Sequence, residues 1–191
     1  MQLVFATNNR NKLKEVQALV LEPIQLLSLE DIDCLEDIPE TQLTIEGNAI
    51  QKIEYLKKHY NIDGFADDTG LEVKALHGEP GVFSARYAGD QRNAQDNMDK
   101  LLKNLEGKTN RSAQFKTVIA LTLKGQLHTF TGICKGTILT EKRGDQGFGY
   151  DPIFQPEGYE QTFAEMDLAL KNQIGHRGKA IKQLVQFLNK K

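Results

Sequence analysis

The sequence predicts an α/β fold, and two patterns carry that prediction. Near the N-terminus, the apolar run Leu3–Ala6 is typical of a buried strand, and apolar residues then recur at helical spacing over residues 13–20. In the second half, Phe115–Leu123 and Leu127–Cys134 are strand-like, and a helical pattern follows over residues 181–188. With 191 residues, the chain is long enough for one large domain or two small lobes that share a sheet.

Composition and charge exclude several classes of protein. Hydrophobic residues make up 39% of the chain and charged residues 26%, which suits a globular domain with a real core. A net charge of −2 and a pI near 6.1 argue against a face that binds a nucleic-acid polymer. No apolar run approaches the ~20 residues that span a bilayer, and no basic leader precedes the first strand, so we expect no membrane segment and no signal peptide. Cys34 and Cys134 have no metal-ligand spacing and indicate reduced thiols in a cytoplasmic protein.

The first polar loop, Thr7–Lys12, lies between the strand at Leu3–Ala6 and a helix that we expect to end at Pro23. Backbone N–H groups at such a helix start favour anions, and Lys12 adds a cation there. The structural alternative is that Asn9 or Asn11 only caps the helix.

The next segment combines an acidic connection with a second helix. Gln25–Leu29 is a candidate edge strand, and residues 30–40 carry many carboxylates that are typical of a solvated loop. Thr44 precedes a helix whose apolar stripe runs from Ala49 to Tyr60. Lys52 lies on the border of that stripe, where it could project into a cleft or simply face solvent.

The central stretch is Phe65–Leu71, where an apolar run meets two adjacent carboxylates. Successive residues of a strand point to opposite faces, so Asp67 and Asp68 are not expected to face the same site. We expect one carboxylate to face a cleft and the other to brace a turn, with a sharp backbone reversal at Gly70. A solvated Asp-Asp turn is the structural alternative.

The remaining elements follow from breakers and periodicity. We expect a turn at His77–Gly81, an amphipathic helix over Asn93–Leu105 and a hairpin at Lys124–Gly125. Phe148 and Tyr150 lie in a glycine-rich loop, where they could stack on a flat ring or pin the loop to the core. A short helical turn at residues 166–170 and a last helix that opens at residues 175–177 complete the chain.

Taken together, these motifs resemble the inosine triphosphate pyrophosphatase family. Six family patterns occur in the family's order. The first three are T-x-N-x-x-K at Thr7–Lys12, T-F-E-E-N-A at Thr44–Ala49 with its following lysine at Lys52, and A-D-D-S-G at Ala66–Gly70. The last three are P-G-x-x-S-A-R-Y at Pro80–Tyr87, F-G-Y-D-P-I-F at Phe148–Phe154 and S-H-R at Gly175–Arg177. Thr69 keeps the hydroxyl of the family's serine, whereas Gly175 lacks the serine side chain and Gly47 replaces a glutamate.

The resemblance implies a fold, an activity and partners. It implies a single domain over residues 1–191 with an elongated mixed β-sheet flanked by helices, and two lobes with a central active-site cleft. It implies an enzyme that hydrolyses non-standard purine nucleoside triphosphates (ITP, dITP and XTP) to the monophosphate and pyrophosphate, which cleanses the nucleotide pool. Mg²⁺ is the implied cofactor, and the family is commonly homodimeric.

The resemblance also assigns roles to residues. Asp68 corresponds to the key carboxylate, as metal ligand and base, with Lys52 as its catalytic partner and Glu40 as a second candidate metal ligand. Asp67 is expected to face away, and His176 and Arg177 to donate to the edge of the base. The implied substrate-binding residues are Thr7, Asn8, Asn9, Arg10, Asn11, Lys12, Thr69, Phe148, Gly149, Tyr150, Asp151, Lys171, His176 and Arg177.

Two other interpretations remain open at this point. A nucleotide sensor without activity could use the same fold, with Asp68 as a structural turn residue. A pyrimidine triphosphatase or a sugar-nucleotide hydrolase would reuse the phosphate-binding residues.

Overall fold

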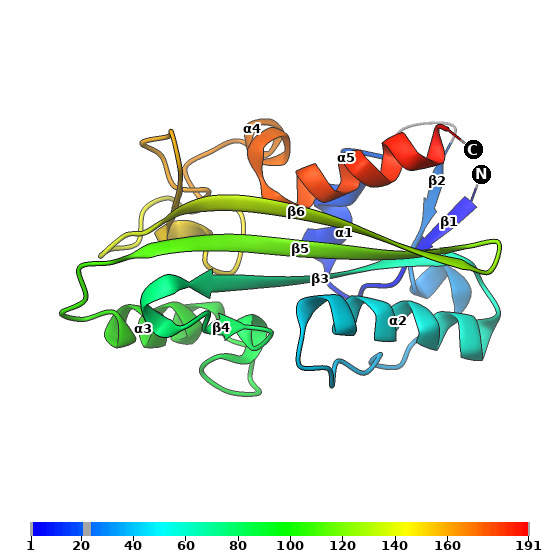
Figure 1. Ribbon diagram of the computed structural model, residues 1–191, viewed down its shortest axis with the longest axis horizontal. Coiled ribbons are helices and arrows are strands. Elements are labelled where there is room, and N and C mark those ends of the chain that lie inside the picture. Colours follow the sequence, from blue (N-terminus) through cyan, green and yellow to red (C-terminus); the bar gives the residue numbers. More distant parts are fainter. Residues whose placement is uncertain (1, 21–23, 191) are drawn as a thin grey trace. The chain divides into compact units, whose positions relative to one another are not determined.

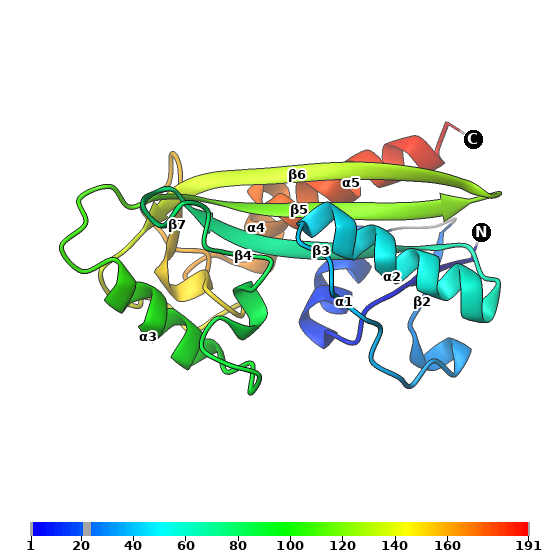
Figure 2. The same ribbon diagram turned by 60° about the horizontal axis from the view of Figure 1, so that its bottom comes forward.

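The structure is a computed structural model and describes residues 2–20 and 24–190. Its sheet contains the strands β1 (Gln2–Phe5), β2 (Gln25–Leu27), β3 (Gly64–Val73), β4 (Pro80–Gly81), β5 (Ser112–Leu123), β6 (Gln126–Ile138) and β7 (Phe154–Pro156). Its α-helices are α1 (Arg10–Gln17), α2 (Ile45–Tyr60), α3 (Ala94–Asn104), α4 (Leu168–Ile174) and α5 (His176–Leu188). Figures 1 and 2 show these elements.

The strands form one mixed sheet. Their order is β2-β1-β3-β5-β6-β7, with β4 paired to β3. β1 pairs in parallel with β2 and β3, whereas β3–β4 and β6–β7 are antiparallel. The prediction of an α/β fold with a mixed sheet and flanking helices is therefore confirmed.

The chain divides into two compact units. Unit 1 comprises residues 1–68, 117–132 and 177–191, and unit 2 comprises residues 69–116 and 133–176. In unit 1, α2 and α5 lie on opposite faces of the sheet (Figure 1). Its core contains Leu3, Phe5, Phe65, Ile119 and Leu184. In unit 2, Met98 and Leu101 of α3 and its C-cap residue Leu105 belong to a core that includes Phe115, Phe154 and Phe163.

Close packing fixes the pairing of β1 with β3. Val4 lies opposite Gly64 and Phe5 opposite Phe65, and the two phenylalanine rings stack with their centroids 4.6 Å apart. A Cβ atom at Gly64 would meet the carbonyl oxygen of Val4 at 2.5 Å, so this register requires glycine. This register in turn fixes the position of Asp67 and Asp68, which follow in β3 beyond the residues paired with β1.

Several local predictions are confirmed. The hairpin turn lies at Lys124–Gly125, where both residues have positive φ (51° and 75°), as a type I′ turn requires. Thr44 and Asn93 cap α2 and α3 through their side chains, and α5 opens at His176.

Two local predictions are wrong. Gly70 makes no reversal, because β3 continues without interruption from Gly64 to Val73 and strand pairing outweighs the turn signal of Asp-Thr-Gly. The first helix ends at Gln17, before Val20, and the predicted stop at Pro23 lies outside the described residues.

Candidate active site

In unit 1, the loop before α1 is held by its own side chains. The Asn9 side chain accepts hydrogen bonds from the backbone N–H groups of Asn11 (3.0 Å) and Lys12 (3.1 Å), which makes Asn9 the N-cap of α1. The Thr7 hydroxyl accepts from the backbone N–H of Asn9 at 3.2 Å. Asn8 reaches the Asp37 carboxylate at 3.4 Å. The structure therefore shows the alternative in which Asn9 caps the helix. Among the remaining predicted residues, Arg10 and Asn11 are exposed.

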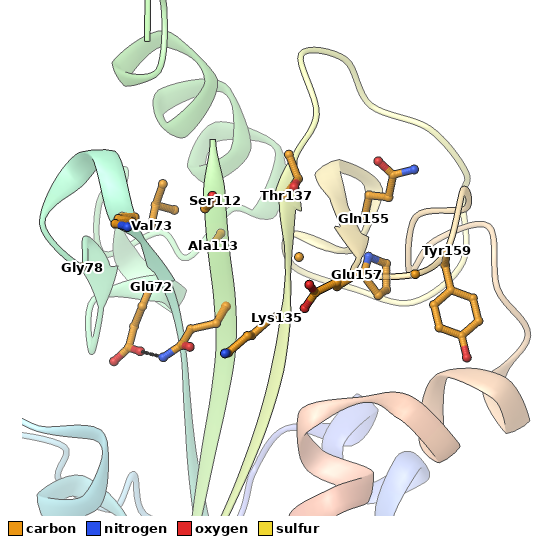
Figure 3. Close-up of a pocket in the computed structure, with 15 residues that line it drawn as sticks. Glu72, Val73, Gly78, Ser112, Ala113, Lys135, Thr137, Gln155, Glu157 and Tyr159 are labelled. Atoms are coloured by element: carbon orange, nitrogen blue, oxygen red, sulfur yellow. Dashed lines mark hydrogen bonds between the residues drawn. The ribbon is translucent and has the colours of Figure 1, made fainter. Parts of the chain in front are cut away.

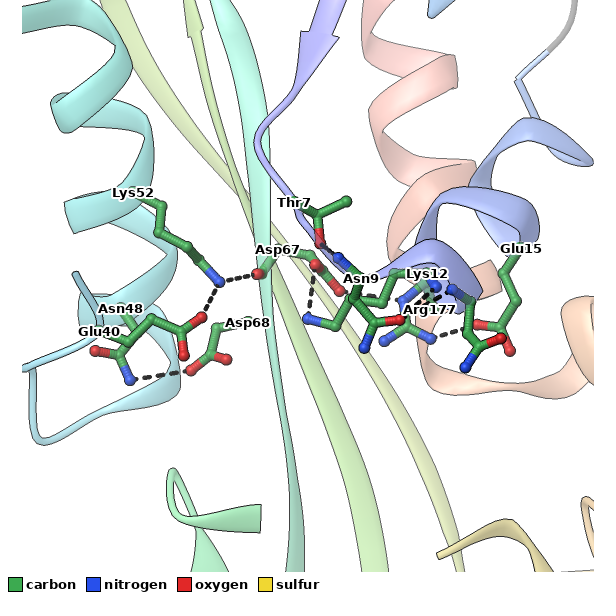
Figure 4. A network of polar contacts seen from close by, with 11 residues as sticks. Thr7, Asn9, Lys12, Glu15, Glu40, Asn48, Lys52, Asp67, Asp68 and Arg177 are labelled. Atoms are coloured by element: carbon green, nitrogen blue, oxygen red, sulfur yellow. Dashed lines mark hydrogen bonds and ion pairs between the residues drawn. The ribbon is translucent and has the colours of Figure 1, made fainter. Parts of the chain in front are cut away.

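Asp67 is the centre of a buried ion network. Its carboxylate contacts the Lys12 ammonium at 2.8 Å and the Arg177 Nε at 3.1 Å, and it is only 1% exposed (Figure 4). Arg177 also donates through Nη1 to the buried carboxylate of Glu15. Burial alone would raise the pKa of Asp67, but the nearby cations Lys12, Arg177 and Lys52 hold it well below its usual range. Asp67 is therefore an ionised anchor for Lys12.

Asp68, the next residue of β3, lies in different surroundings. It is 7% exposed, and its Oδ2 accepts from the Asn48 side chain at 3.2 Å (Figure 4). The Asn48 carbonyl oxygen in turn accepts from the backbone N–H of Gln42 at 2.8 Å, which fixes the orientation of the amide. Burial raises the pKa of Asp68, and the carboxylate of Glu40 adds to the increase. A carboxylate that is reluctant to ionise binds a proton more readily than an ordinary aspartate.

Lys52 is buried beside these carboxylates. Its ammonium donates to Glu40 Oε1 and to the backbone carbonyl oxygen of Asp67, both at 2.6 Å. Burial disfavours the ammonium, but Glu40, Asp68 and Asp67 outweigh this effect and raise the pKa of Lys52. The solvated alternative for Lys52 is therefore wrong, and the lysine stays charged at neutral pH.

The acidic groups of unit 1 suit a metal that keeps most of its ligands outside the protein. No cluster of three or more His, Cys, Asp or Glu side chains with metal-binding geometry occurs in residues 2–20 and 24–190. Asp68 and Glu40 influence each other electrostatically, as two nearby carboxylates do. Mg²⁺ usually takes one or two carboxylates and completes its shell with phosphate oxygens and waters. Asp68 and Glu40 fit that requirement.

In unit 2, an ion pair fixes the glycine-rich loop. Lys171 of α4 contacts Asp151 at 2.6 Å, and both side chains are buried. The same carboxylate accepts the backbone N–H of Phe148 at 2.8 Å. The Lys171 ammonium also lies 4.8 Å from the centre of the Phe148 ring. The partly exposed Phe148 ring is thus held in place, and Gly149 next to it has a positive φ of 65°.

The other predicted residues of unit 2 are placed differently. Tyr150 is 4% exposed and belongs to the core, and its hydroxyl donates to the backbone carbonyl of Ser84 at 2.8 Å. Of the two alternatives for Tyr150, the structure shows the one in which it pins the loop. His176 is also buried, with its ring stacked on Phe115 at 4.6 Å. Thr69 is half-buried in β3.

Sequence reasoning missed several residues of these two groups. Asn48 was visible only as part of the Thr44–Ala49 motif. Glu15 had one weak signal, an acidic residue beside the apolar Val16 in α1. Ser84 had none beyond its place in the Pro80–Tyr87 motif.

A separate pocket occurs on the sheet of unit 2. It has a volume of about 730 Å³, and two of the residues that line it, Gln114 and Glu72, are joined by a hydrogen bond of 2.7 Å. Figure 3 shows this lining. Lys135, Glu157 and Tyr159 also line it. None of the predicted site residues lines this pocket. Its lining mixes acidic and basic groups without a common chemistry.

Comparisons with known proteins agree over nearly the whole chain. The model of the Ham1 family matches residues 3–187. A protein from Flavobacterium johnsoniae named dITP/XTP pyrophosphatase is 63% identical over 98% of both chains, and one of the same name from Christiangramia forsetii is 57% identical over the full length of both. Among solved structures, a HAM1 protein from Coxiella burnetii is 39% identical with a TM-score of 0.92 and covers 100% of both chains. The Staphylococcus aureus Ham1 protein is also 39% identical, with a TM-score of 0.90 over 99% of this chain and 98% of that one.

Proposed function

This chain belongs to the Ham1 family, and we propose that it hydrolyses non-standard purine nucleoside triphosphates, namely dITP, ITP and XTP, to the monophosphate and pyrophosphate. The observation that carries the proposal is the full-length similarity to proteins named dITP/XTP pyrophosphatase. Its chemical support is a buried carboxylate, Asp68, beside a charged lysine, Lys52, and a second carboxylate, Glu40.

We assign the proton transfer of the reaction to Asp68. A water molecule attacks the α-phosphorus while one of its protons moves to the Asp68 carboxylate. The phosphoanhydride bond between the α- and β-phosphates breaks, and its electron pair leaves with pyrophosphate. The raised pKa of Asp68 favours this transfer, because it increases the carboxylate's affinity for a proton.

Mg²⁺ is the proposed cofactor, and Asp68 and Glu40 are the residues that would hold it. When bound, it would supply charge neutralisation for the phosphate oxygens and the leaving pyrophosphate. Lys52 is already hydrogen-bonded to Glu40 and would keep that carboxylate in place.

The triphosphate is proposed to bind near the start of α1 and Lys52. Lys12 is held by its ion pair with Asp67. Its ammonium would contact phosphate oxygens either while it keeps this ion pair or by exchanging the carboxylate for a phosphate. The network with Arg177 keeps Asp67 ionised and so holds Lys12 in place before the substrate arrives. Such preorganisation reduces the ordering that binding would otherwise require.

The base is proposed to stack on Phe148. The ring is partly exposed and is held by the Asp151–Lys171 pair, so it offers a fixed flat surface. A stacked ring accepts any purine, and selection therefore needs a polar contact with the base edge. Donation by His176 and Arg177 to the 6-carbonyl oxygen, which adenine lacks, remains our proposal for that contact.

We further propose that the protein acts in the cytoplasm as a homodimer. Two buried free thiols, Cys34 and Cys134, suit a reducing compartment. The dimer rests on family resemblance. Light scattering behind size exclusion should give twice the 21.5 kDa chain mass, and a mass of one chain at micromolar concentration would contradict the dimer.

A nucleotide panel tests the proposed function. Pyrophosphate release is measured with Mg²⁺ and dITP, ITP, XTP, ATP, GTP, CTP and UTP at equal concentrations. We expect dITP, ITP and XTP to be hydrolysed at least about tenfold more efficiently than ATP, because buried donors left without a partner penalise adenine. We expect the same advantage over GTP, whose base has the 6-carbonyl oxygen but whose 2-amino group would be crowded. Binding without pyrophosphate release would instead favour a nucleotide sensor, and a preference for CTP or UTP would favour a pyrimidine triphosphatase.

A further inference from the structure

The hydroxyl group of Ser84 forms hydrogen bonds with the backbone of two neighbouring strands, β3 and β4. Leu71 of β3 and Gly81 of β4 are direct partners in the antiparallel ladder. The backbone N–H of Leu71 donates to Ser84 Oγ at 2.8 Å, and that hydroxyl donates to the Gly81 carbonyl oxygen at 2.6 Å. The Ser84 side chain therefore stands between a backbone donor and a backbone acceptor. Because its lone pair and its proton are both used, its position is tightly defined.

The backbone of the same residue holds a second element. The Ser84 carbonyl oxygen accepts the hydroxyl proton of Tyr150 at 2.8 Å. Ser84 is 8% exposed and Tyr150 is 4% exposed, so both groups would lack water as a substitute partner. Tyr150 lies between Gly149 and Asp151 in the loop that carries Phe148. Ser84 thus connects β3, at a point shortly after Asp68 and Thr69, with the loop proposed to stack the base.

We propose that Ser84 is a positioning residue for base binding: its hydroxyl fixes the 81–84 turn on β3, and its carbonyl fixes the Phe148 loop through Tyr150. This inference rests on the proposed function. It gives the Pro80–Tyr87 motif a role in base binding that requires no contact between the motif and the substrate. Ser84 acts at a distance, through a chain of two hydrogen bonds and a buried ring. It is not a catalytic residue.

A merely structural Ser84 would produce a different pattern of effects. Loss of stability lowers the melting temperature and leaves the folded molecules with normal affinity. Loss of positioning weakens binding of ligands that carry a base and spares ligands that consist of phosphate alone. Inosine monophosphate and tripolyphosphate separate these two cases, because the first has the base and the second has none.

The variants are Ser84→Ala, Tyr150→Phe and their combination. Ser84→Ala keeps the carbonyl acceptor but removes the hydroxyl that fixes its place. Tyr150→Phe removes the donor and leaves the Leu71–Ser84–Gly81 contacts intact. The matched control is Tyr87→Phe, since Tyr87 is a buried tyrosine whose hydroxyl donates to Glu79 and accepts from Asn104, both outside the Phe148 loop.

For the wild type and each variant, calorimetry measures the Kd of inosine monophosphate, and kcat and KM are measured with ITP. Inhibition of ITP hydrolysis by tripolyphosphate gives the Ki of tripolyphosphate. We expect Ser84→Ala and Tyr150→Phe each to raise the Kd and the KM about three- to tenfold, with kcat and the tripolyphosphate Ki changed less than about twofold. The double variant should be no weaker than about the worse single variant, because both changes break the same connection. Tyr87→Phe should leave the Kd within about twofold, even where its melting temperature falls by a similar amount.

An unchanged Kd in Tyr150→Phe overturns the inference, and so does an equal rise in Tyr87→Phe or an additive double variant. If Ser84→Ala does not fold, Tyr150→Phe and its control still decide the question. If the wild-type protein binds inosine monophosphate but releases no pyrophosphate from ITP, the proposed function fails while the Kd values still test the role of Ser84. If the wild-type protein hydrolyses ITP but does not bind inosine monophosphate, the proposed function stands, and the KM values for ITP decide the role of Ser84 by the same criteria.

Discussion

Asp67 and Asp68 are adjacent in one strand and carry opposite electrostatic shifts. The pKa of Asp67 is lowered, because its cations outweigh burial, whereas the pKa of Asp68 is raised, because burial outweighs Lys52, Lys12 and the Asn48 amide. The alternation of a strand separates them, so that one carboxylate can hold Lys12 while the other remains available for chemistry. Two identical side chains thus have opposite electrostatic surroundings, and we propose that one serves as an anchor and the other as a proton acceptor.

Replacing Asp68 by asparagine tests its role directly. Asp68→Asn keeps the shape of the side chain but removes its basicity, and we expect kcat to fall by at least about 100-fold. The melting temperature should stay the same or rise, because an ionised carboxylate with a raised pKa costs folding free energy above that pKa. Pyrophosphate release and a melting curve measure the two effects. Activity above about a tenth of the wild type would contradict both the base and the metal-ligand role.

The pKa of Asp68 also predicts how activity depends on pH. Only the ionised form accepts a proton, so kcat/KM should fall with unit slope as the pH drops below the raised pKa of Asp68, and the fall should begin at a higher pH than an ordinary aspartate gives. The stabilisation from Asp67 should be lost at a lower pH than the activity: it is present above the unfolded pKa of 3.8 and is lost as the pH falls from there through the lowered folded pKa. If the residual activity of Asp68→Asn keeps the same acidic limb of kcat/KM, another group is the base.

At the scale of elements, α1 and α2 each deliver one lysine to a carboxylate of unit 1. Lys12 and Lys52 are both largely buried, and each already has an anionic partner. We expect Lys12→Met and Lys52→Met to weaken binding of ITP far more than binding of inosine, since a lysine–phosphate contact is charge-assisted and inosine has no phosphate. Each should also cost about 1–3 kcal/mol of stability, because Asp67 or Glu40 loses a charge-assisted hydrogen bond.

The matched control for both lysines is Lys57→Met. Lys57 lies in α2 and pairs with Asp63 at 3.1 Å, but its side chain is 39% exposed, far more than those of Lys12 and Lys52. Its loss should cost less than about 1 kcal/mol and leave ITP binding unchanged. Titration of each variant with ITP and with inosine measures the difference. Equal losses for the two ligands would show that the lysines support the fold and not the phosphates.

The start of α5 raises the question of which group reads the base. Arg177 is 3% exposed and contacts Asp67 and Glu15, so its removal leaves a buried carboxylate behind. We therefore expect Arg177→Met to fold best together with Glu15→Gln. If Arg177 reads the 6-carbonyl, this double variant should lower the ITP-to-ATP ratio of kcat/KM by about tenfold or more. An unchanged ratio, with both substrates weakened alike, would assign Arg177 to the support of Lys12.

Local chemistry predicted the elements better than their contacts. The hairpin at Lys124–Gly125 and the capped start of α2 follow from neighbouring residues, and both are confirmed. Asp-Thr-Gly gave a false turn signal, because β3 gains its hydrogen bonds from strands that are distant in sequence. The contact of Arg177 with Asp67 spans 110 residues, and no local pattern encodes it. The motifs identified which residues belong to the site, but their pairing required the fold.

At the scale of the whole molecule, the two units share strands. β3, β5 and β6 each begin in one unit and end in the other. Along β5, Phe115 belongs to the core of unit 2, and Ile119 belongs to the core of unit 1. If one unit unfolds, each shared strand loses its structure over part of its length, and the remaining part belongs to the unit that is still folded. Such continuity favours one cooperative transition over two independent ones.

We expect calorimetry to show a single unfolding transition, with equal calorimetric and van't Hoff enthalpies per cooperative unit. Ile119→Val and Phe115→Leu each remove buried methyl or ring volume from one core and should cost about 1 kcal/mol. In a cooperative molecule, either change lowers the same melting temperature, by about 2–4 °C for each kcal/mol in a chain of this size. As a control, a change at the exposed Leu127 of β6 should leave the transition in place. Two resolved transitions, with Ile119→Val moving one and Phe115→Leu moving the other, would show that the shared strands do not couple the units.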